Sequence, residues 1–151
     1  MSDIEIWTDG GCQGNPGPGG WAYIVVAGGA EREAAGFEPG TTNNRMELTA
    51  VREALASLPA GSVSTSITVH TDSQYVQKGI TEWIHTWERN GWRTSGKQPV
   101  KNSELWRALS ELSRGRQIRW VWVMGHAGNE RNERCDRLVQ EAIARGLKRS
   151  D

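Results

Sequence analysis

Two aspartates, Asp9 and Asp72, each stand at the end of an apolar run that is typical of a buried strand. If the two strands are parallel neighbours in one sheet, their ends meet at one edge and the two carboxylates come close together. Two bare anions in one site repel each other, and a divalent cation removes that conflict. Oxygen ligands at strand ends suit Mg²⁺, which binds few protein carboxylates and keeps several waters. The pair therefore indicates a magnesium site.

Each acid near this pair also has a structural interpretation. Asp72 could cap the helix that follows it, and Glu47, three residues after Asn44, could complete a capping box. Asp136 borders the apolar stripe of the last expected helix and could be a surface acid. A purely structural role is harder to assign to Asp9, because a glycine follows it and no helix begins there that it could cap. By spacing alone, the four acids make only a weak case for a metal.

The segment after Asp9 has very few side chains, since Gly10 to Gly20 holds six glycines and two prolines. Glycine allows main chain to approach a ligand closely, and a plain hairpin loop is the alternative. The glycines do not follow the G-x-G-x-x-G spacing of a dinucleotide site, and no P-loop lysine follows them. We therefore exclude a dinucleotide site here.

The elements that must position these residues follow from hydrophobic periodicity. Hairpin strands come first, and helices then alternate with strands, which favours parallel additions with right-handed crossovers. The expected fold class is α/β, a five-stranded mixed β-sheet flanked by helices, with its site where strand ends meet. Strands are expected over residues 4–9, 20–27, 32–38, 66–71 and 117–123. Helices are expected from 41–44 to 58, over 74–114 with breaks at 90–91 and 95–99, and from 132 onward.

The composition is that of one globular domain spanning residues 1–151, with 36% hydrophobic and 24% charged residues. Eighteen basic and eighteen acidic residues cancel, so the net charge identifies no partner. Cys12 and Cys135 lack the spacing of a zinc site or disulfide framework, and they are expected to be free thiols in a reducing compartment. No basic leader or membrane-length apolar run is present, so a cytoplasmic protein is expected, with residues 147–151 as a disordered tail.

Six blocks of sequence together resemble the type 1 ribonuclease H family, and bacterial ribonuclease HI in particular. They occur in the family's order and with its spacing over nearly the whole chain. The blocks are Thr8 to Cys12, Gly14 to Gly17, Thr42 to Leu48, Thr71 to Val76, Gly125 to Gly128 and Asn132 to Asp136. The resemblance implies a ribonuclease H-like fold and an endonuclease that cleaves the RNA strand of RNA–DNA hybrids.

The resemblance also implies which residues form the site. Asp9, Glu47, Asp72 and Asp136 would bind two Mg²⁺ ions, or Mn²⁺ in their place. His126, which would otherwise be taken as a solvated loop residue, would be the catalytic histidine. A monomer is expected, with products that carry a 5′-phosphate and a 3′-hydroxyl, and with a role in removing RNA primers and R-loops. The residues implied in substrate binding are Cys12, Asn15, Thr42, Asn43, Asn44, Gln74, Tyr75, Trp83, Trp106 and Asn132.

A second binding element is expected at residues 84–101, which resemble the basic protrusion, or handle, of the family. Its bases are Arg89, Arg93, Lys97 and Lys101, with no acid between the first and the last and with tryptophans interleaved. The alternative is a solvated helix pair whose tryptophans pack in the core. Relatives often carry a denser lysine cluster, and serine where this chain has Gly11. These departures leave the strength of hybrid binding open and do not affect the chemistry.

Two other functions remain open at this point. Integrases, resolvases and some exonucleases share the sheet and the clustered acids, but they lack the Thr42 to Leu48 and Thr71 to Val76 blocks found here. A hybrid-binding module without catalysis could dispense with one or more acids, whereas this chain keeps all four. Cleavage assays on a hybrid and on a DNA duplex, with and without a chelator, would separate the three functions.

Overall fold

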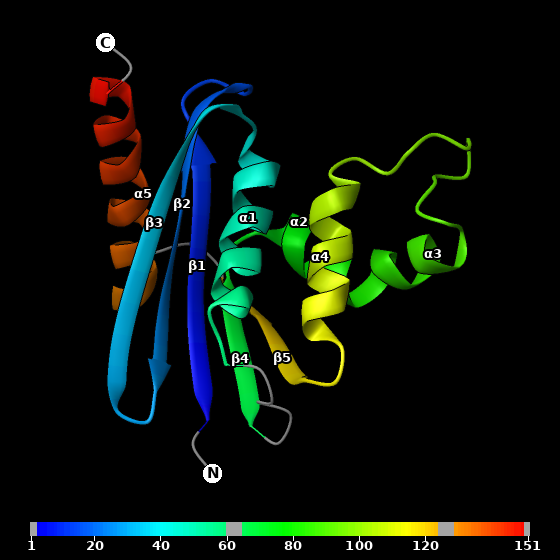
Figure 1. The fold of residues 1–151 in the computed structure, drawn as a ribbon, viewed down its shortest axis with the longest axis horizontal. Helices are drawn as coiled ribbons and strands as arrows, with labels where there is room; N and C mark the ends of the chain where they lie inside the picture. The colour runs from blue at the N-terminus through cyan, green and yellow to red at the C-terminus, as the bar shows by residue number, and fades with distance from the viewer. Residues whose placement is uncertain (1–2, 60–64, 124–128, 150–151) are drawn as a thin grey trace.

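The computed structural model describes residues 3–59, 65–123 and 129–149. A mixed sheet of five strands runs through this part of the chain in the order β3-β2-β1-β4-β5 (Figure 1). β1 pairs with β2 antiparallel and with β4 parallel, and β5 is parallel to β4. The expected fold class and the pairing of the first and fourth strands are confirmed. The strands are β1 Ile4–Cys12, β2 Gly17–Ala27, β3 Ala30–Thr41, β4 Ser66–Thr71 and β5 Gln117–Trp122.

The glycine-rich segment belongs largely to the sheet, where a loop was expected. β1 continues past Asp9 to Cys12 and still pairs with β2 there, so only residues 13–16 connect the two strands. The expected loop from Gly10 to Gly20 was therefore wrong. Hydrophobic periodicity cannot report this pairing, because glycine has no side chain that alternates between the faces of a strand.

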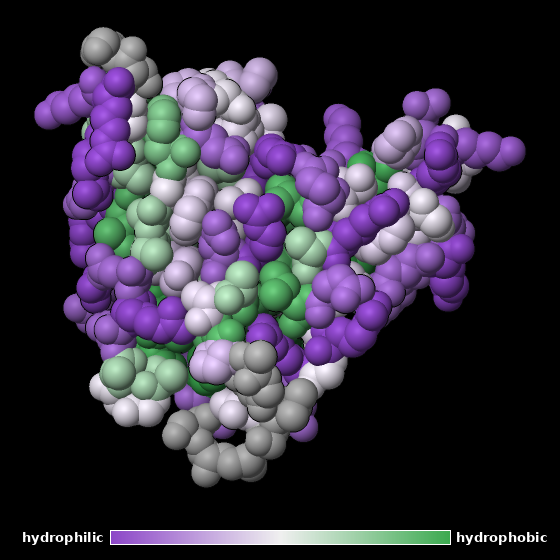
Figure 2. Space-filling model, viewed as in Figure 1, coloured by the Kyte–Doolittle hydropathy of each residue, from purple (hydrophilic) through white to green (hydrophobic). Residues whose placement is uncertain are grey.

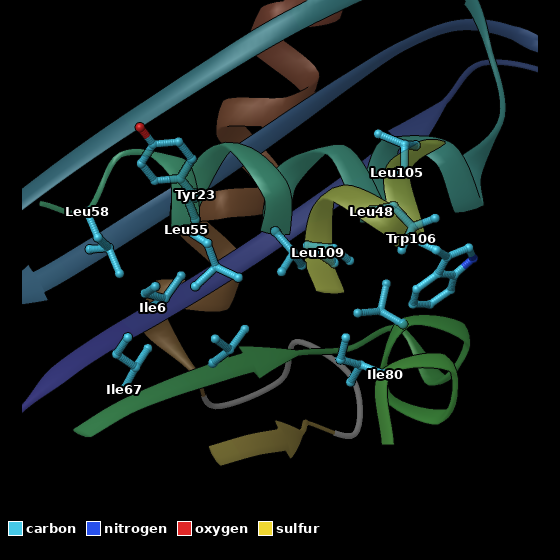
Figure 3. Packing of buried hydrophobic residues seen from close by; sticks show 14 of the residues in the cluster. Ile6, Tyr23, Leu48, Leu55, Leu58, Ile67, Ile80, Leu105, Trp106 and Leu109 are labelled. Carbon is cyan, nitrogen blue, oxygen red and sulfur yellow. The ribbon is translucent and has the colours of Figure 1, made fainter. Parts of the chain in front are cut away.

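Helices cover both faces of the sheet (Figure 1). The larger core lies between the sheet, α1 (Asn43–Ala56) and α4 (Ser103–Ser113). The smaller core lies under α5 (Glu130–Arg149), where Cys135 and Val139 pack against the sheet. The central strand β1 is therefore buried on both faces, which holds its end and Asp9 rigidly. The larger core includes Ile6, Leu48, Leu55, Ile67, Leu105, Trp106 and Leu109 (Figure 3).

Three short helical segments follow β4: α2 (Gln74–Lys78), the π-helical η2 (Gly79–Trp83) and α3 (Ile84–Arg89). A Cβ at Gly79 would lie 2.0 Å from the Trp106 ring, so glycine is needed where η2 approaches α4. The expected break in helix at 90–91 is confirmed, since α3 ends there. From α3 onward the chain projects away from the sheet as an arm, defined here as residues 84–101 (Figure 1). Its surface is mainly hydrophilic (Figure 2).

The buried residues of α5 recur every three or four positions, and the rest of the helix is rich in charge. This one-sided pattern anchors α5 on the sheet while its outer face stays in water. Within the described ranges, no helix combines the length and the apolar character needed to cross a membrane.

Candidate active site

Three carboxylates meet at the edge of the sheet where β1 and β4 end. Asp9, Glu47 and Asp72 each offer one carboxylate oxygen, and these oxygens lie within 4.8 Å of one another. Asp9 lies on β1 and Asp72 directly follows β4, so the parallel pairing of the strands brings the two side chains together. Glu47 arrives from α1, which packs over β1. The structure thus joins the two aspartates as strand pairing predicted, and it adds Glu47.

The start of α1 determines where Glu47 lies. The hydroxyl of Thr42 caps the helix by accepting a hydrogen bond from the Arg45 N–H at 3.2 Å. The interpretation of Asn44 and Glu47 as a capping box was therefore wrong. Glu47 instead lies in the second helical turn and is only 8% exposed. A Cβ at Gly10 would lie 2.5 Å from the Glu47 nitrogen, so glycine is required where β1 and α1 approach each other.

Asp72 is not a helix cap either. The cap of α2 is Ser73, whose hydroxyl accepts a hydrogen bond from the Val76 N–H at 3.1 Å. Asp72 is positioned through its backbone, because its carbonyl accepts a hydrogen bond from the Trp122 indole at 3.2 Å. Its carboxylate therefore serves the acid cluster and not the helix.

A pocket of about 330 Å³ is lined by all four acids that the sequence singled out. Asp136 reaches this pocket from α5, with its side chain half-buried. It lies outside the set of three whose oxygens fall within 4.8 Å of one another. We call this site the acid pocket. Its other lining residues are Gly10, Gly11, Asn43, Ser73, Val139 and Gln140.

Burial and mutual repulsion disfavour the charged form of Glu47. Burial raises the pKa of this carboxyl well above its ordinary value, and the charges of Asp9 and then Asp72 raise it further. Among the described residues, Glu47 Oε1 is buried and has no hydrogen-bond partner. A set of hard oxygen donors with a buried oxygen that needs a partner fits a hard divalent cation such as Mg²⁺.

The residues between β1 and β2 form a hydrogen-bonded group beside the acid pocket. The Cys12 N–H donates to Asn43 Oδ1 at 2.9 Å, and the Asn43 N–H donates to Asn15 Oδ1 at 3.2 Å. The Cys12 thiol donates to the Gly14 carbonyl at 2.8 Å. Burial raises the pKa of this thiol, so it stays protonated at neutral pH. Three residues that the resemblance implied in substrate binding therefore lie together.

A second pocket, of about 540 Å³, lies between the start of α1 and the arm. Four residues implied in substrate binding line it, and the arm contributes Lys101. Asn15 belongs both to this pocket and to the hydrogen-bonded group at Cys12. The hydrogen-bonded group at Cys12 therefore lies between the two pockets, with Asn43 lining the acid pocket and Asn15 lining the second pocket. The lining residues are Asn15, Thr42, Asn44, Tyr75, Trp87, Thr94, Val100, Lys101 and Asn102.

A row of aromatic rings connects the second pocket to the core. Tyr75, Trp83, Trp87 and Trp106 are neighbours whose ring centroids lie 5.3 to 5.9 Å apart. Trp83 is 37% exposed and can meet a ligand. Trp106 is fully buried and donates a hydrogen bond to the Tyr75 hydroxyl at 3.2 Å. The expectation that Trp106 contacts substrate is corrected: its ring supports Tyr75 from the core.

The bases of the arm lie in water. Arg89, Arg93, Lys97 and Lys101 are all exposed, and the Arg93 guanidinium donates to the Lys97 carbonyl at 3.2 Å. The tryptophans of the arm behave differently, because Trp87 and Trp92 are partly buried against the larger core. The packing of these tryptophans and the solvation of the charges agree with the alternative interpretation, and the binding role of the bases stays a prediction.

Gln74 and Asn132, which the resemblance also implied in substrate binding, line neither of the two pockets as the structure describes them. Gln74 is exposed at the start of α2. Asn132 is fully buried near the start of α5, and its amide atoms have no hydrogen-bond partner within the described ranges. His126 lies outside the described residues.

Two residues that frame the second pocket were missed from the sequence. Arg45 donates to Asn102 Oδ1 at 3.3 Å and also pairs with Glu104. Asn102 Nδ2 donates to the Tyr75 hydroxyl at 3.4 Å, and its φ of 57° is a left-handed conformation that asparagine tolerates. Arg45 lies inside the Thr42 to Leu48 block, but its partner Asn102 is 57 residues away. Only folding reveals that pair.

Comparison with known proteins gives a consistent result. The model of the RNase H family matches residues 1–144. A protein of Aromatoleum aromaticum named Ribonuclease H is 58% identical over 144 residues, covering 95% of this chain and 92% of that protein.

Solved structures agree with this match. LC9-RNase H1, a type 1 RNase H with the type 2 active-site motif, is similar with a TM-score of 0.82 and 33% identity over 95% of this chain and 73% of that one. LC11-RNase H1 in complex with an RNA/DNA hybrid is similar with a TM-score of 0.73 and 26% identity, covering 96% of this chain and 99% of that one.

Proposed function

The chain belongs to the ribonuclease H family, and on that premise we propose that it is a metal-dependent endonuclease that hydrolyses the RNA strand of RNA–DNA hybrids. The observation that carries this proposal is the cluster of Asp9, Glu47 and Asp72, with one oxygen of each within 4.8 Å of the others. Burial and mutual repulsion disfavour full ionisation of such a cluster without a cation, and phosphodiester hydrolysis is chemistry that such a cation serves.

Asp9, Glu47, Asp72 and Asp136 would hold two Mg²⁺ ions, with Mn²⁺ as the alternative. When bound, the ions would supply an acidified water and stabilise the leaving 3′ oxygen. Products with a 5′-phosphate and a 3′-hydroxyl would follow from that direction of cleavage.

The chain's own residues prepare the site. Asp9 lies within β1, Glu47 within α1 and Asp72 directly after β4, so regular backbone holds or adjoins all three positions. Because burial and the neighbouring aspartates raise the pKa of Glu47, a bound cation would favour the charged form of this acid. We assign His126 to proton movement or product release, and Asn132 to the surroundings of the attacking water.

Recognition of the RNA strand would use the edge of the acid pocket. A hybrid displays 2′-hydroxyls in a shallow minor groove, and these groups distinguish RNA from DNA without any reading of sequence. The group formed by Cys12, Asn15 and Asn43 presents amide and main-chain groups beside the acids, which supports its assignment to ribose contacts. Asn44, Gln74 and Tyr75 would extend these contacts.

The DNA strand would lie across the second pocket and the arm. Thr42 and Lys101 line that pocket, and Trp83 is exposed near it, which supports contacts to DNA phosphates and sugars. The exposed bases Arg89, Arg93 and Lys97 would extend the phosphate contacts outward. The remaining parts of the proposal rest on the sequence: the family resemblance implies a monomer that removes RNA primers and R-loops, and the composition predicts a cytoplasmic location.

The direct test is cleavage of a labelled RNA–DNA hybrid, an RNA duplex and a DNA duplex in Mg²⁺, in Mn²⁺ and with a chelator. We expect cuts in the RNA strand of the hybrid alone, dependent on the metal, with 5′-phosphate ends. The matched control is Asp3→Asn, because Asp3 is an exposed acid outside the acid pocket.

Other outcomes would contradict the proposal. Cleavage of the DNA duplex without cleavage of the hybrid would favour the resolvase class. Binding of the hybrid without cleavage under every metal condition would favour a binding module.

A further inference from the structure

Two rings are stacked on the face of the sheet that α5 covers. Trp7 on β1 and His70 on β4 are paired in the ladder, and their ring centroids lie 4.5 Å apart with the planes inclined by 6°. The guanidinium carbon of Arg131, near the start of α5, lies 4.8 Å from the centroid of the Trp7 ring. The indole is 6% exposed, so this cation–π contact is largely shielded from water.

Acidic side chains flank both ends of this stack. His70 lies 3.5 Å from a Glu5 carboxylate oxygen on β1. Arg131 Nε donates to Glu31 Oε1 on β3 at 2.9 Å, so the guanidinium over Trp7 is oriented from a second side. A guanidinium that stacks on a ring and is also ion-paired, as Arg131 is, loses most of its freedom to move.

The next turn of α5 continues the same attachment. Arg134 pairs with Glu31 at 3.4 Å and also with Glu33 on β3. The buried Cys135 thiol donates to the Trp7 carbonyl at 3.5 Å. Side chains from consecutive turns of α5 therefore reach β1, β3 and, through Trp7, β4.

The stack lies close in sequence to three of the pocket acids. Trp7 is two residues before Asp9, and His70 is two residues before Asp72. Arg131 is five residues before Asp136, the acid that reaches the pocket from α5. Asp9 and Asp72 are placed by the β1–β4 ladder, whereas Asp136 is placed by the packing of a helix on a sheet. The acid pocket therefore needs something that sets the start of α5 against β1 and β4.

We propose that the stack of Arg131, Trp7 and His70 is a positioning device that sets Asp136 relative to Asp9 and Asp72. The inference rests on the proposed function, since it gives Asp136 a metal-binding role. Arg131 and His70 are positioning residues, because they act through α5 and β4 and touch no reacting atom. The specific element is the stacked contact, so a flat ring at position 70 should suffice even without an imidazole nitrogen near Glu5.

The test compares Arg131→Met, His70→Ala and His70→Phe with Arg145→Met. Arg145 is a matched control because it lies on the same helix and forms an exposed ion pair with Glu141 at 3.8 Å. Near-UV circular dichroism and thermal melts first establish the temperature at which each variant is folded. Hybrid cleavage then gives kcat, KM and the Mg²⁺ concentration at half-maximal rate. Calorimetric titration of the metal-free protein with Mg²⁺ gives a readout that is independent of turnover.

We expect Arg131→Met and His70→Ala to lower kcat about fivefold, with KM for the hybrid within about twofold of the original. Their half-maximal Mg²⁺ concentration and calorimetric Kd should rise severalfold. His70→Phe should restore kcat and Mg²⁺ affinity, and Arg145→Met should change neither. If Arg131→Met does not fold, Arg131→Lys replaces it in the test, because lysine keeps a cation over the indole. Its kcat and Mg²⁺ affinity should lie between those of the original protein and those of His70→Ala.

A lower melting temperature with unchanged kcat and unchanged Mg²⁺ affinity would overturn the inference, because it would make the stack structural only. Equal losses in His70→Ala and His70→Phe would overturn it too, since stacking would then not be the cause. If the unmodified protein cleaves no hybrid, the proposed function fails on its own account. The calorimetric comparison still decides the role of the stack in that case.

Discussion

The acid pocket and the arm represent two ways of building a functional surface. Asp9 and Glu47 are 6% and 8% exposed and sit on a strand and a helix inside the fold. The bases of the arm, by contrast, are exposed on a projection that is buried mainly where Ile84 and Val100 join the core. Chemistry gains from burial, because the interaction between charges is stronger and their geometry is fixed. Phosphate binding works at exposed charges, since counterion release supplies much of its free energy.

Backbone conformation shows the same contrast. Among the described residues, the non-glycine positions with positive φ are Trp92, Lys97 and Asn102, all within the arm or next to its end. Such conformations cost Trp92 and Lys97 roughly 1–2 kcal/mol each, whereas asparagine tolerates them. The shape of the arm therefore lowers its local stability, whereas the acid pocket is built on the regular pairing of β1 with β4. Changes in the pocket should alter turnover or folding, and changes in the arm should alter binding.

The largest effect that this comparison predicts is on turnover. On the proposed function, Asp9→Asn should lower kcat by at least about a hundredfold, because it removes a charge that would hold the metal and contribute several kcal/mol to the transition state. The fold should persist, and the metal-free protein should become more stable because repulsion with Glu47 is relieved. Single-turnover cleavage and urea unfolding in a chelator measure both effects. Near-full activity would show that the pocket is not the catalytic site.

The second effect is on folding, and glycine provides the matched pair. A Cβ in Gly10→Ala would lie 2.4 to 2.6 Å from backbone atoms of Met46 and Glu47, which cannot move aside as a side chain can. We expect a loss of about 3 kcal/mol in the free energy of unfolding. On the arm, Gly96→Ala meets only the Thr94 hydroxyl at 3.9 Å, and it should change stability by less than about 0.5 kcal/mol. Similar losses in the two variants would remove the distinction between the regions.

The third effect is on binding. Replacing Arg89, Arg93, Lys97 and Lys101 together by glutamine should raise KM for the hybrid and leave kcat within about twofold. The slope of log K against log salt should become shallower by about 3 to 4, because each phosphate that a base neutralises adds about 0.9 to it. A control that changes the exposed Arg114 and Arg119, outside the arm, to glutamine should keep the original slope. An unchanged slope in the arm variant would exclude the arm from the hybrid interface.

The smallest effect is a pH dependence of the free energy of unfolding that arises from the acid pocket. The folded state holds the Glu47 proton more tightly than the unfolded chain does, because the pKa of Glu47 is raised above its ordinary 4.5. Its contribution to stability is therefore fully present below that ordinary value and is lost as pH rises through the raised pKa. Urea unfolding across this pH range in a chelator should show the loss. Glu47→Gln should remove it, and Mg²⁺ should reduce it; an identical slope in the glutamine variant would rule out Glu47 as the source.

Much of the fold followed from local pattern. Alternating and helical apolar spacing located all five strands and the helices, and the parallel pairing of strands one and four followed from their order. The errors came where side chains carry no pattern or where one residue fits two roles. Glycines concealed the extension of β1 to Cys12, and Asn44 and Asp72 both looked like caps until Thr42 and Ser73 proved to hold those positions.

Residue type and order along the chain were sufficient for the strand-end aspartates, the family resemblance and the basic segment, because these are properties of short stretches. Packing between residues far apart in the chain determined the other features of the site. It brought Glu47 from α1 to the two aspartates, withdrew Trp106 into the core, joined Arg45 to Asn102, and stacked Arg131 on Trp7. The physical reason is that the burial and partners of a side chain depend on which distant surfaces meet, and spacing along one strand or helix does not contain that information.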